Sequence, residues 1–215
     1  MFLLGQEPVF PPIELASEEG ILAIGGDLSP ERLITAYTKG IFPWYNEGEP
    51  IVWYSPDPRM VLFPAKVKIS KSMRKIIRDS VFTVTFNQNF KEVIGACKSI
   101  SRKGQKGTWI TDALEKAMIQ LHQKGIAKSV EVWQNGQLAG GLYGVDLGNV
   151  FCGESMFSKV SNASKVAFIA LAQKCEKENY SLIDCQVYNP HLESLGAEEI
   201  PRSVFKKYLK KKRKE

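Results

Sequence analysis

Histidine is scarce in this chain of 215 residues, which holds only His122 and His191. The four cysteines are widely separated and include no CxxC pair; they are Cys97, Cys152, Cys175 and Cys185. So few candidate ligands disfavour a zinc site, and the cysteine spacing does not indicate a disulfide scaffold. Unpaired cysteines fit a reducing compartment, so we expect a cytoplasmic protein without a resident metal.

Long hydrophobic runs and a basic leader are also missing. The longest uninterrupted apolar run covers residues 166–172, whereas roughly 20 residues are needed to cross a bilayer. No Lys or Arg precedes Arg32, so the first residues lack the basic region of a secretory signal. We therefore expect no membrane association. With 44% hydrophobic and 24% charged residues, the composition indicates a globular protein of one large or two small domains.

The net charge of +6 is distributed very unevenly. Residues 1–64 carry 3 basic and 9 acidic side chains, and residues 111–201 carry 7 and 11. Residues 65–110 carry 11 basic and 2 acidic side chains, and residues 202–215 carry 8 and 1. Two basic blocks are therefore set into an otherwise acidic chain. The terminal block is equally compatible with a solubilising tail, whereas the internal one, which ends in Arg102, Lys103 and Lys106, is more informative.

Four cations of the internal block have the i, i+3, i+4, i+7 spacing of one helical face; they are Lys71, Arg74, Lys75 and Arg78. No glutamate is interleaved with them, so the face lacks the ion pairs of an ordinary solvated helix. We interpret it as a surface that contacts nucleic-acid phosphates, with a plain solvated face as the alternative. The spacing does not distinguish duplex DNA from RNA.

Helix and turn signals divide the chain near residue 58. Ser29 followed by Pro30 predicts a helix start, and Gly40 predicts its end. Residues 51–54 are typical of a short strand, which the Pro-rich segment 55–59 terminates. We place the domain boundary there, with a small N-terminal domain over residues 1–58 and a second domain over residues 59–215.

The second domain alternates helical and strand patterns. Strands are predicted at 61–63 and 81–86 on either side of the basic helix, and a helix is predicted from Thr111 to Gly125. Strands at 129–133 and 138–145 flank the hairpin signal Asn135-Gly136, and another follows at 149–157. A helix at 165–177, capped by Asn162 or Ser164, a strand at 181–187 and a helix at 204–214 complete the pattern. This order predicts an α+β fold whose mainly antiparallel sheet is flanked by helices, as in GNAT-like acyltransferase domains.

The expected fold makes one enzyme class testable from sequence. Acetyl-CoA-dependent enzymes of this architecture need a glycine-rich loop before the helix that follows the fourth strand, where backbone N–H groups bind pyrophosphate. Residues 157–164 contain no glycine. A CoA-dependent acetyltransferase is therefore disfavoured.

Several polar and aromatic side chains stand out as candidate functional residues. Asp184 and Gln186 share one face of an apolar strand, where they are costly unless paired or functional; alternatively, Asp184 fixes a loop through backbone hydrogen bonds. Glu154 lies among aromatic residues, with a solvated hairpin edge as its alternative. Trp44 and Trp109 beside a basic block favour stacking on an unpaired base, although each alone is more often a core residue.

Six segments together resemble the leucyl/phenylalanyl-tRNA–protein transferase family. They occur in that family's order over nearly the whole chain; they are GGDLS at 25–29, GIFPW at 40–44, WYSPDPR at 53–59, GTWIT at 107–111, FCGESMF at 151–157 and IDCQ at 183–186. The resemblance implies a monomeric bacterial enzyme with no cofactor. It would move leucine or phenylalanine, with methionine as a further candidate, from aminoacyl-tRNA to proteins with N-terminal Arg or Lys. The product would carry an N-end-rule degradation signal.

The resemblance also implies roles for individual residues. Trp44 and Trp109 would hold the terminal adenosine of the tRNA. The pocket for the transferred side chain would be lined by Tyr37, Leu142 and Phe151. Glu154, Asp184 and Gln186 would form the acceptor and catalytic site: the Gln186 carbonyl would accept a hydrogen bond from the attacking amine, Asp184 would orient that amide, and Glu154 would pair with the acceptor's cation. Proton transfer through a tRNA hydroxyl and a non-catalytic RNA-binding module remain the alternatives.

Two positions depart from the pattern of familiar members. Leu142 and Leu171 stand where the family leads us to expect Met and Phe. We expect these changes to reshape the side-chain pocket and to shift the preference among leucine, phenylalanine and methionine.

Overall fold

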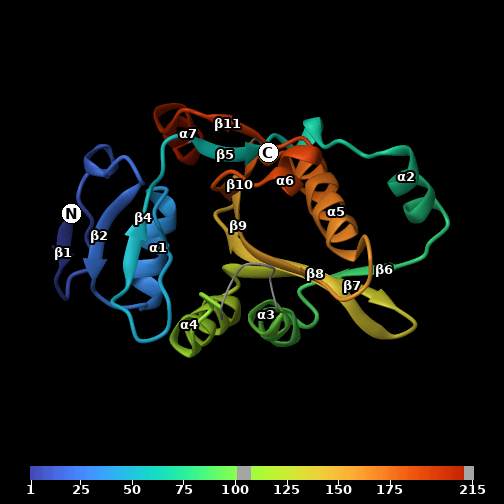
Figure 1. The fold of residues 1–215 in the computed structure, drawn as a ribbon, viewed down its shortest axis with the longest axis horizontal. Coiled ribbons are helices and arrows are strands. Elements are labelled where there is room, and N and C mark those ends of the chain that lie inside the picture. The colour runs from blue at the N-terminus through green and yellow to red at the C-terminus, as the bar shows by residue number, and fades with distance from the viewer. Residues whose placement is uncertain (101–107, 211–215) are drawn as a thin grey trace.

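The computed structural model describes residues 1–100 and 108–210 (Figure 1). Its N-terminal part is a four-stranded sheet in the order β1-β2-β4-β3. The strands are β1 (Phe2–Leu4), β2 (Ile21–Gly25), β3 (Phe42–Pro43) and β4 (Val52–Tyr54), with a 3-10 turn η1 (Ile13–Leu15) and helix α1 (Pro30–Thr38) between them. This small sheet lies at one end of the molecule, beside α1 and α4 (Figure 1).

Helix α1 forms where the sequence predicts it. The Ser29 side chain accepts a hydrogen bond from the backbone N–H of Arg32 at 3.3 Å, and Pro30 occupies the first turn, where its missing N–H leaves no bond unmade. The helix ends before Gly40, whose φ of +78° turns the chain into β3. The Gly40 carbonyl is thereby placed beside the larger sheet, where it accepts a bond from Arg59.

The larger part is a seven-stranded sheet in the order β11-β5-β10-β9-β8-β7-β6. Its strands are β5 (Arg59–Leu62), β6 (Thr83–Phe86), β7 (Ala127–Gln134), β8 (Gln137–Asp146), β9 (Val150–Ser158), β10 (Leu182–Gln186) and β11 (Glu198–Ile200). Only the β9–β10 pair is parallel; every other pair is antiparallel. The mainly antiparallel sheet predicted from sequence is confirmed.

Helices cover both faces of the large sheet. They are α2 (Lys71–Arg78), α3 (Phe90–Ser99), α4 (Asp112–Gln123), α5 (Ala163–Lys177), α6 (Pro190–Ser194) and α7 (Arg202–Leu209), with a 3-10 turn η2 (Pro64–Lys66). Figure 1 shows α3 and α4 on one side of β7 and β8, and α5 on the other. Helix, antiparallel meander, helix, strand and helix follow one another as predicted, so the GNAT-like arrangement is confirmed. None of the helices within residues 1–100 and 108–210 combines the length and apolar character needed to cross a membrane.

Two local predictions need correction. Asn162 occupies the N-cap position of α5 in a left-handed conformation (φ 71°), and its side chain makes no capping bond. The Ser158 hydroxyl instead accepts a bond from the Ser164 backbone N–H at 3.2 Å, because the loop brings the end of β9 under the helix. The C-terminal helix begins at Arg202 rather than at residue 204 and extends to Leu209, and residues 211–215 lie outside the described chain.

Two β-bulges shape the centre of the large sheet. Tyr143 pairs with Ser155 and Gly144 with Gly153, so Glu154 is the extra residue of β9. On the other side of the sheet's parallel pair, Asp184 and Gln186 of β10 pair with adjacent residues of β5, so Cys185 is the extra residue there. The β9–β10 pairing itself stops at Cys152 and Asp184. Because bulges bend a strand and redirect its side chains, β9 and β10 diverge beyond this point.

Gly144 is required by the β8–β9 bulge. A Cβ atom at this position would lie 2.2 Å from the Cys152 carbonyl oxygen and 2.6 Å from the Phe151 ring. Neither the backbone oxygen nor the packed ring has room to move. Gly95 in α3 is the contrasting case, because a Cβ atom there would meet no atom within 4 Å.

We predict that Gly144→Ala destabilises the protein by about 2 kcal/mol or more, because it overpacks the bulge. Gly95→Ala, the matched control, should stabilise it by about 0.5–1 kcal/mol, because alanine loses less backbone entropy than glycine in a helix. Urea unfolding followed by circular dichroism measures both changes. Equal effects of the two substitutions would contradict the steric role of Gly144.

Candidate active site

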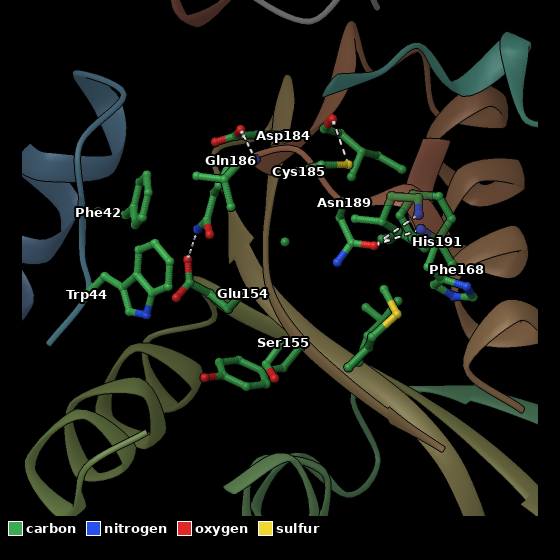
Figure 2. A pocket seen from close by; sticks show the side chains of 18 of the residues that line it. Phe42, Trp44, Glu154, Ser155, Phe168, Asp184, Cys185, Gln186, Asn189 and His191 are labelled. Atoms are coloured by element: carbon green, nitrogen blue, oxygen red, sulfur yellow. Dashed lines mark hydrogen bonds between the residues drawn. The ribbon is translucent and has the colours of Figure 1, made fainter. Parts of the chain in front are cut away.

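A cavity of about 360 Å³ opens where β9 and β10 diverge (Figure 2). Its walls are formed by residues 42–44 at β3, by Trp109 before α4, by the middle of β8, by the two diverging strands, and by the facing parts of α5 and α6. The cavity therefore lies at the junction of the small N-terminal sheet and the large sheet. Seven of the residues selected from sequence line it; they are Trp44, Trp109, Leu142, Glu154, Leu171, Asp184 and Gln186.

Glu154 and Gln186 point toward one another across the gap between the strands (Figure 2). The Gln186 Nε2 donates a hydrogen bond to Glu154 Oε1 at 2.6 Å. Glu154 is only 9% exposed, and burial raises its pKa to about 8, although interactions with the Tyr37 hydroxyl and the Gln186 amide act in the opposite direction. Since the amide nitrogen faces Glu154, the amide oxygen of Gln186 remains available to a ligand.

Asp184 forms a fully buried ion pair with Arg59. Arg59 Nε and Nη2 donate to the two Asp184 carboxylate oxygens at 2.8 and 2.7 Å. Asp184 Oδ1 also accepts a bond from the backbone N–H of Gln186 at 2.9 Å. Asp184 was expected to orient the side-chain amide of Gln186; it holds the backbone instead, and Glu154 holds the amide. The bulge explains this difference, because Gln186 adopts a left-handed conformation (φ 67°) that turns its N–H toward Asp184.

The two tryptophans stand at the cavity from different parts of the fold. Trp44 follows β3 and is 39% exposed, with its ring 5.6 Å from that of Tyr54. Trp109 is half-buried and precedes Thr111, the N-cap of α4. Both residues line the cavity, so each offers aromatic surface to a ligand there.

An apolar wall lies on the α5 side of the cavity; it consists of Leu142, Met156, Phe168, Leu171 and Ile183. Leu142 is in the place expected from the sequence. Phe151 instead borders a separate cavity of about 250 Å³ that also includes Cys175. Tyr37 is fully buried and lies outside the cavity wall, with its hydroxyl against Glu154. Both residues were expected to line the pocket for the transferred side chain. Phe151 of β9 and Tyr37 of α1 instead lie outside the wall of this cavity.

Three further residues at the site have no role predicted from the sequence; they are Arg59, Asn189 and His191. Arg59 stands directly before the buried strand segment 60–62, and a lone arginine in such a place is a signal for a buried partner. Asn189 lines the cavity and caps α6 through bonds to its first N–H groups. His191 also lines the cavity, and its Nε2 is buried without a hydrogen-bond partner among the described residues.

The cysteines and acidic residues offer no further chemistry at this site. Burial raises the pKa of the Cys152 and Cys185 thiols well above the ordinary value, which disfavours the reactive thiolate. Within the part of the chain that the structure describes, no three His, Cys, Asp or Glu side chains gather in a way that could hold a metal ion.

The predicted basic helix is α2, and it presents its cations to solvent. Ser70 caps it, Met73 is its one buried residue, and Lys71, Arg74, Lys75 and Arg78 are all exposed. Arg78 pairs with the neighbouring Asp79 at 3.0 Å. Figure 1 shows α2 at the end of the molecule opposite the N-terminal sheet. Arg102, Lys103 and Lys106 lie outside the described residues.

Two cations of the C-terminal basic block make contacts within the fold. Lys206 of α7 pairs with Glu14 at 2.5 Å, and Arg202 donates to the Ser55 carbonyl at 2.5 Å. These cations therefore attach α7 to the N-terminal part of the chain.

The buried state of Glu154 generates a pH prediction. Its pKa is raised from 4.5 to about 8, so between these values the folded protein retains a proton that the unfolded chain releases. The stability of the wild-type protein should therefore fall as the pH rises from about 5 to about 8. Glu154→Gln removes this titration and keeps an oxygen for the Gln186 amide.

The free energy of unfolding of Glu154→Gln minus that of the wild type should be larger at about pH 8 than at about pH 5, by on the order of 2 kcal/mol. Urea unfolding at the two pH values measures this gain. Substitution of an exposed glutamate, Glu47→Gln, is the matched control and should show no such change. A constant difference between Glu154→Gln and the wild type at both pH values would contradict the prediction.

Comparison with known proteins identifies the family. The model of the leucyl/phenylalanyl-tRNA protein transferase family matches residues 61–210, and the model of that family's N-terminal domain matches residues 26–57. The two matches together cover most of the chain and include the residues that line the cavity.

Three relatives are similar over almost their whole length, and each is named leucyl/phenylalanyl-tRNA–protein transferase. The protein of Flavobacterium johnsoniae is 65% identical over 212 residues, 99% of this chain and 100% of that protein. Those of Christiangramia forsetii and Flavobacterium psychrophilum are 59% and 57% identical, covering 97% and 98% of this chain and all of their own. The chain therefore belongs to the leucyl/phenylalanyl-tRNA–protein transferase family.

Proposed function

We propose that this protein transfers leucine or phenylalanine, with methionine as a further candidate, from aminoacyl-tRNA to the α-amino group of proteins with N-terminal Arg or Lys. The modified protein then carries an N-end-rule degradation signal. One observation supports this proposal above others: a single cavity holds two tryptophans, an apolar wall and the partly buried, hydrogen-bonded pair of Glu154 and Gln186. The aminoacyl-tRNA would bring a base and an apolar side chain into this cavity, and the acceptor protein would bring the reacting amine.

The reaction demands little chemistry from the protein. The aminoacyl ester of tRNA is already activated, and an α-amine with a pKa of about 7.7–8.0 is partly neutral near pH 7. Holding the amine against the ester carbonyl supplies up to about 7–11 kcal/mol in favourable cases. A covalent enzyme intermediate is unnecessary, which agrees with the raised pKa of the Cys152 and Cys185 thiols.

Each wall of the cavity receives one part of the substrates in this proposal. The terminal adenosine stacks on Trp44 and Trp109, since aromatic rings bind unpaired bases. The amino-acid side chain packs on the apolar wall that contains Leu142 and Leu171. The departure from the expected Met and Phe at these positions changes the shape of this wall and hence the preference among Leu, Phe and Met.

Gln186 and Glu154 bind the acceptor. The Gln186 amide oxygen, which is turned away from Glu154, accepts a hydrogen bond from the attacking α-amine. Glu154 pairs with the cationic part of the acceptor, because a buried carboxyl that receives a cation is favoured in its charged form. Loss of the proton from Glu154 on binding then balances the charge brought in by Arg or Lys.

The remaining partners follow from the charge distribution. The exposed cations of α2 contact tRNA phosphates, which gives backbone affinity without base readout. The protein works as a monomer in the cytoplasm, where aminoacyl-tRNA is available.

The first prediction of this proposal concerns the reaction itself. The purified chain, leucyl-tRNA and matched peptides that begin with Arg, Lys or Ala are mixed, and the products are read by mass spectrometry. Leucine should be added to the Arg and Lys peptides only. Binding of the tRNA without addition to any peptide would contradict the proposal and favour a non-catalytic RNA-binding module.

A second prediction concerns α2. The logarithm of the tRNA binding constant should fall linearly with the logarithm of salt concentration, and Lys71→Ala with Lys75→Ala should reduce that slope by about 0.7–0.9 per lysine removed. Lys177→Ala, at an exposed position at the end of α5, is the control for the loss of one lysine elsewhere on the surface and should leave the slope unchanged. Filter binding at several salt concentrations measures the slopes. An unchanged slope in the α2 double variant would place the phosphate contacts elsewhere.

A further inference from the structure

Arg59 is almost completely buried, and its guanidinium makes three hydrogen bonds and two ring contacts. It is 1% exposed, and its guanidinium donates two bonds to Asp184 and a third to the Gly40 carbonyl at 3.2 Å. The flat faces of the guanidinium lie 4.9 Å from the centre of the Phe42 ring and 4.8 Å from that of Phe205. One side chain thus contacts the β3 loop, strand β10 and helix α7.

Both carboxylate oxygens of Asp184 are already hydrogen-bonded within the protein. Both carboxylate oxygens bind Arg59, and Oδ1 additionally accepts the backbone N–H of Gln186. The residue is 0% exposed. A carboxylate placed in this way neither takes a proton from the acceptor nor touches the ester, so its effect on the reaction passes through the groups that it holds.

The group that Asp184 holds is the backbone of Gln186. This residue has a φ of 67°, in the left-handed region that non-glycine residues rarely adopt, and it follows directly after the bulge at Cys185. Such a conformation persists when surrounding contacts fix it. Here the bond from Gln186 N–H to Asp184 fixes the backbone, and the side chain then reaches Glu154 at 2.6 Å.

Arg59 also fixes the opposite wall of the cavity. Its bond to Gly40 and its contact with the Phe42 ring hold the start of the segment that leads to Trp44. Both Phe42 and Trp44 line the cavity (Figure 2). Arg59 therefore connects the wall that carries the tryptophan to the strand that carries Gln186.

We propose that Arg59 is a positioning residue of the active site, which acts through Asp184 to hold Gln186 in its reactive orientation against Glu154. This inference rests on the proposed function, since it assigns the parts of that same site. Asp184 is then a positioning residue as well. Gln186 and Glu154 are the groups that contact the substrates.

The test asks whether Gln186 still matters once Arg59 is changed. Single-turnover transfer rates are measured for Gln186→Ala in the wild-type, Arg59→Lys and Arg32→Lys backgrounds, with folding checked by circular dichroism. Arg32 is the matched control: it is also fully buried and paired, with Asp27 and the carbonyls of Gly5 and Gln6, but it lies outside the cavity.

In the wild type, Gln186→Ala should lower the rate by about 100-fold, the usual scale for losing one positioned catalytic hydrogen bond. The same loss should appear in the Arg32→Lys background. In the Arg59→Lys background, which should itself be slowed by about 100-fold, removal of Gln186 should change the rate by less than about threefold. This non-additivity is expected because the Gln186 amide is already displaced.

A merely structural role of Arg59 gives a different result. Gln186→Ala would then cost the same factor in all three backgrounds, and this outcome would overturn the proposal. If Arg59→Lys does not fold, Asp184→Asn replaces it, because it keeps the shape of the pair and removes one charge; the same non-additivity is expected. The wild-type rate is measured first: its absence would refute the proposed function itself, whereas a normal wild-type rate with additive losses would refute only the role of Arg59.

Discussion

The divergence of β9 and β10 is the constraint on which the site depends. Parallel pairing brings the two strands together as far as Cys152 and Asp184, and a bulge in each strand then prevents further pairing. Unpaired strand ends leave backbone groups and side chains directed into the space between them. The residues just beyond the last pair, Glu154 and Gln186, consequently face one another, and the cavity forms around them. Without the two bulges, strict alternation would direct these side chains into the sheet's packed faces.

Two buried carboxylates close to this point have different surroundings. Asp184 receives a guanidinium through two bonds, whereas Glu154 interacts with a neutral amide and a hydroxyl, with smaller contributions from the charges of Asp184 and Arg59. Burial therefore raises the pKa of Glu154 to about 8. The pair with Arg59 costs desolvation, yet it leaves no uncompensated charge and holds three chain segments in register. The site thus combines a buried ion pair that holds the chain with a buried carboxyl of raised pKa.

Local signals in the sequence were sufficient for most of the large sheet and its helices. Ser29-Pro30, Asn135-Gly136 and Thr111 each contain the capping or turn chemistry that the structure uses. Helix α3 was not predicted, although its buried residues Phe90, Val93, Ile94 and Cys97 have the i, i+3, i+4, i+7 spacing of a helical face. The bulges also escaped prediction, since they arise from strand pairing between distant segments. For the same reason the sequence indicated Glu154, Asp184 and Gln186 as a group but gave neither the Arg59 partner nor the burial of Tyr37.

The location of the cavity explains why the small and large sheets are tied together so firmly. Residues 42–44 form one wall and belong to the N-terminal sheet, whereas the polar pair belongs to the large sheet. Arg59 links these walls from inside, and α7 links the same two parts from outside through Lys206 and Arg202. A continuous hydrophobic core runs from Leu22 and Trp53 to Val93 and Leu114. A relative movement of the two sheets would change the distance between the tryptophan and the reacting groups, so the contacts that suppress this movement also preserve the geometry that transfer requires.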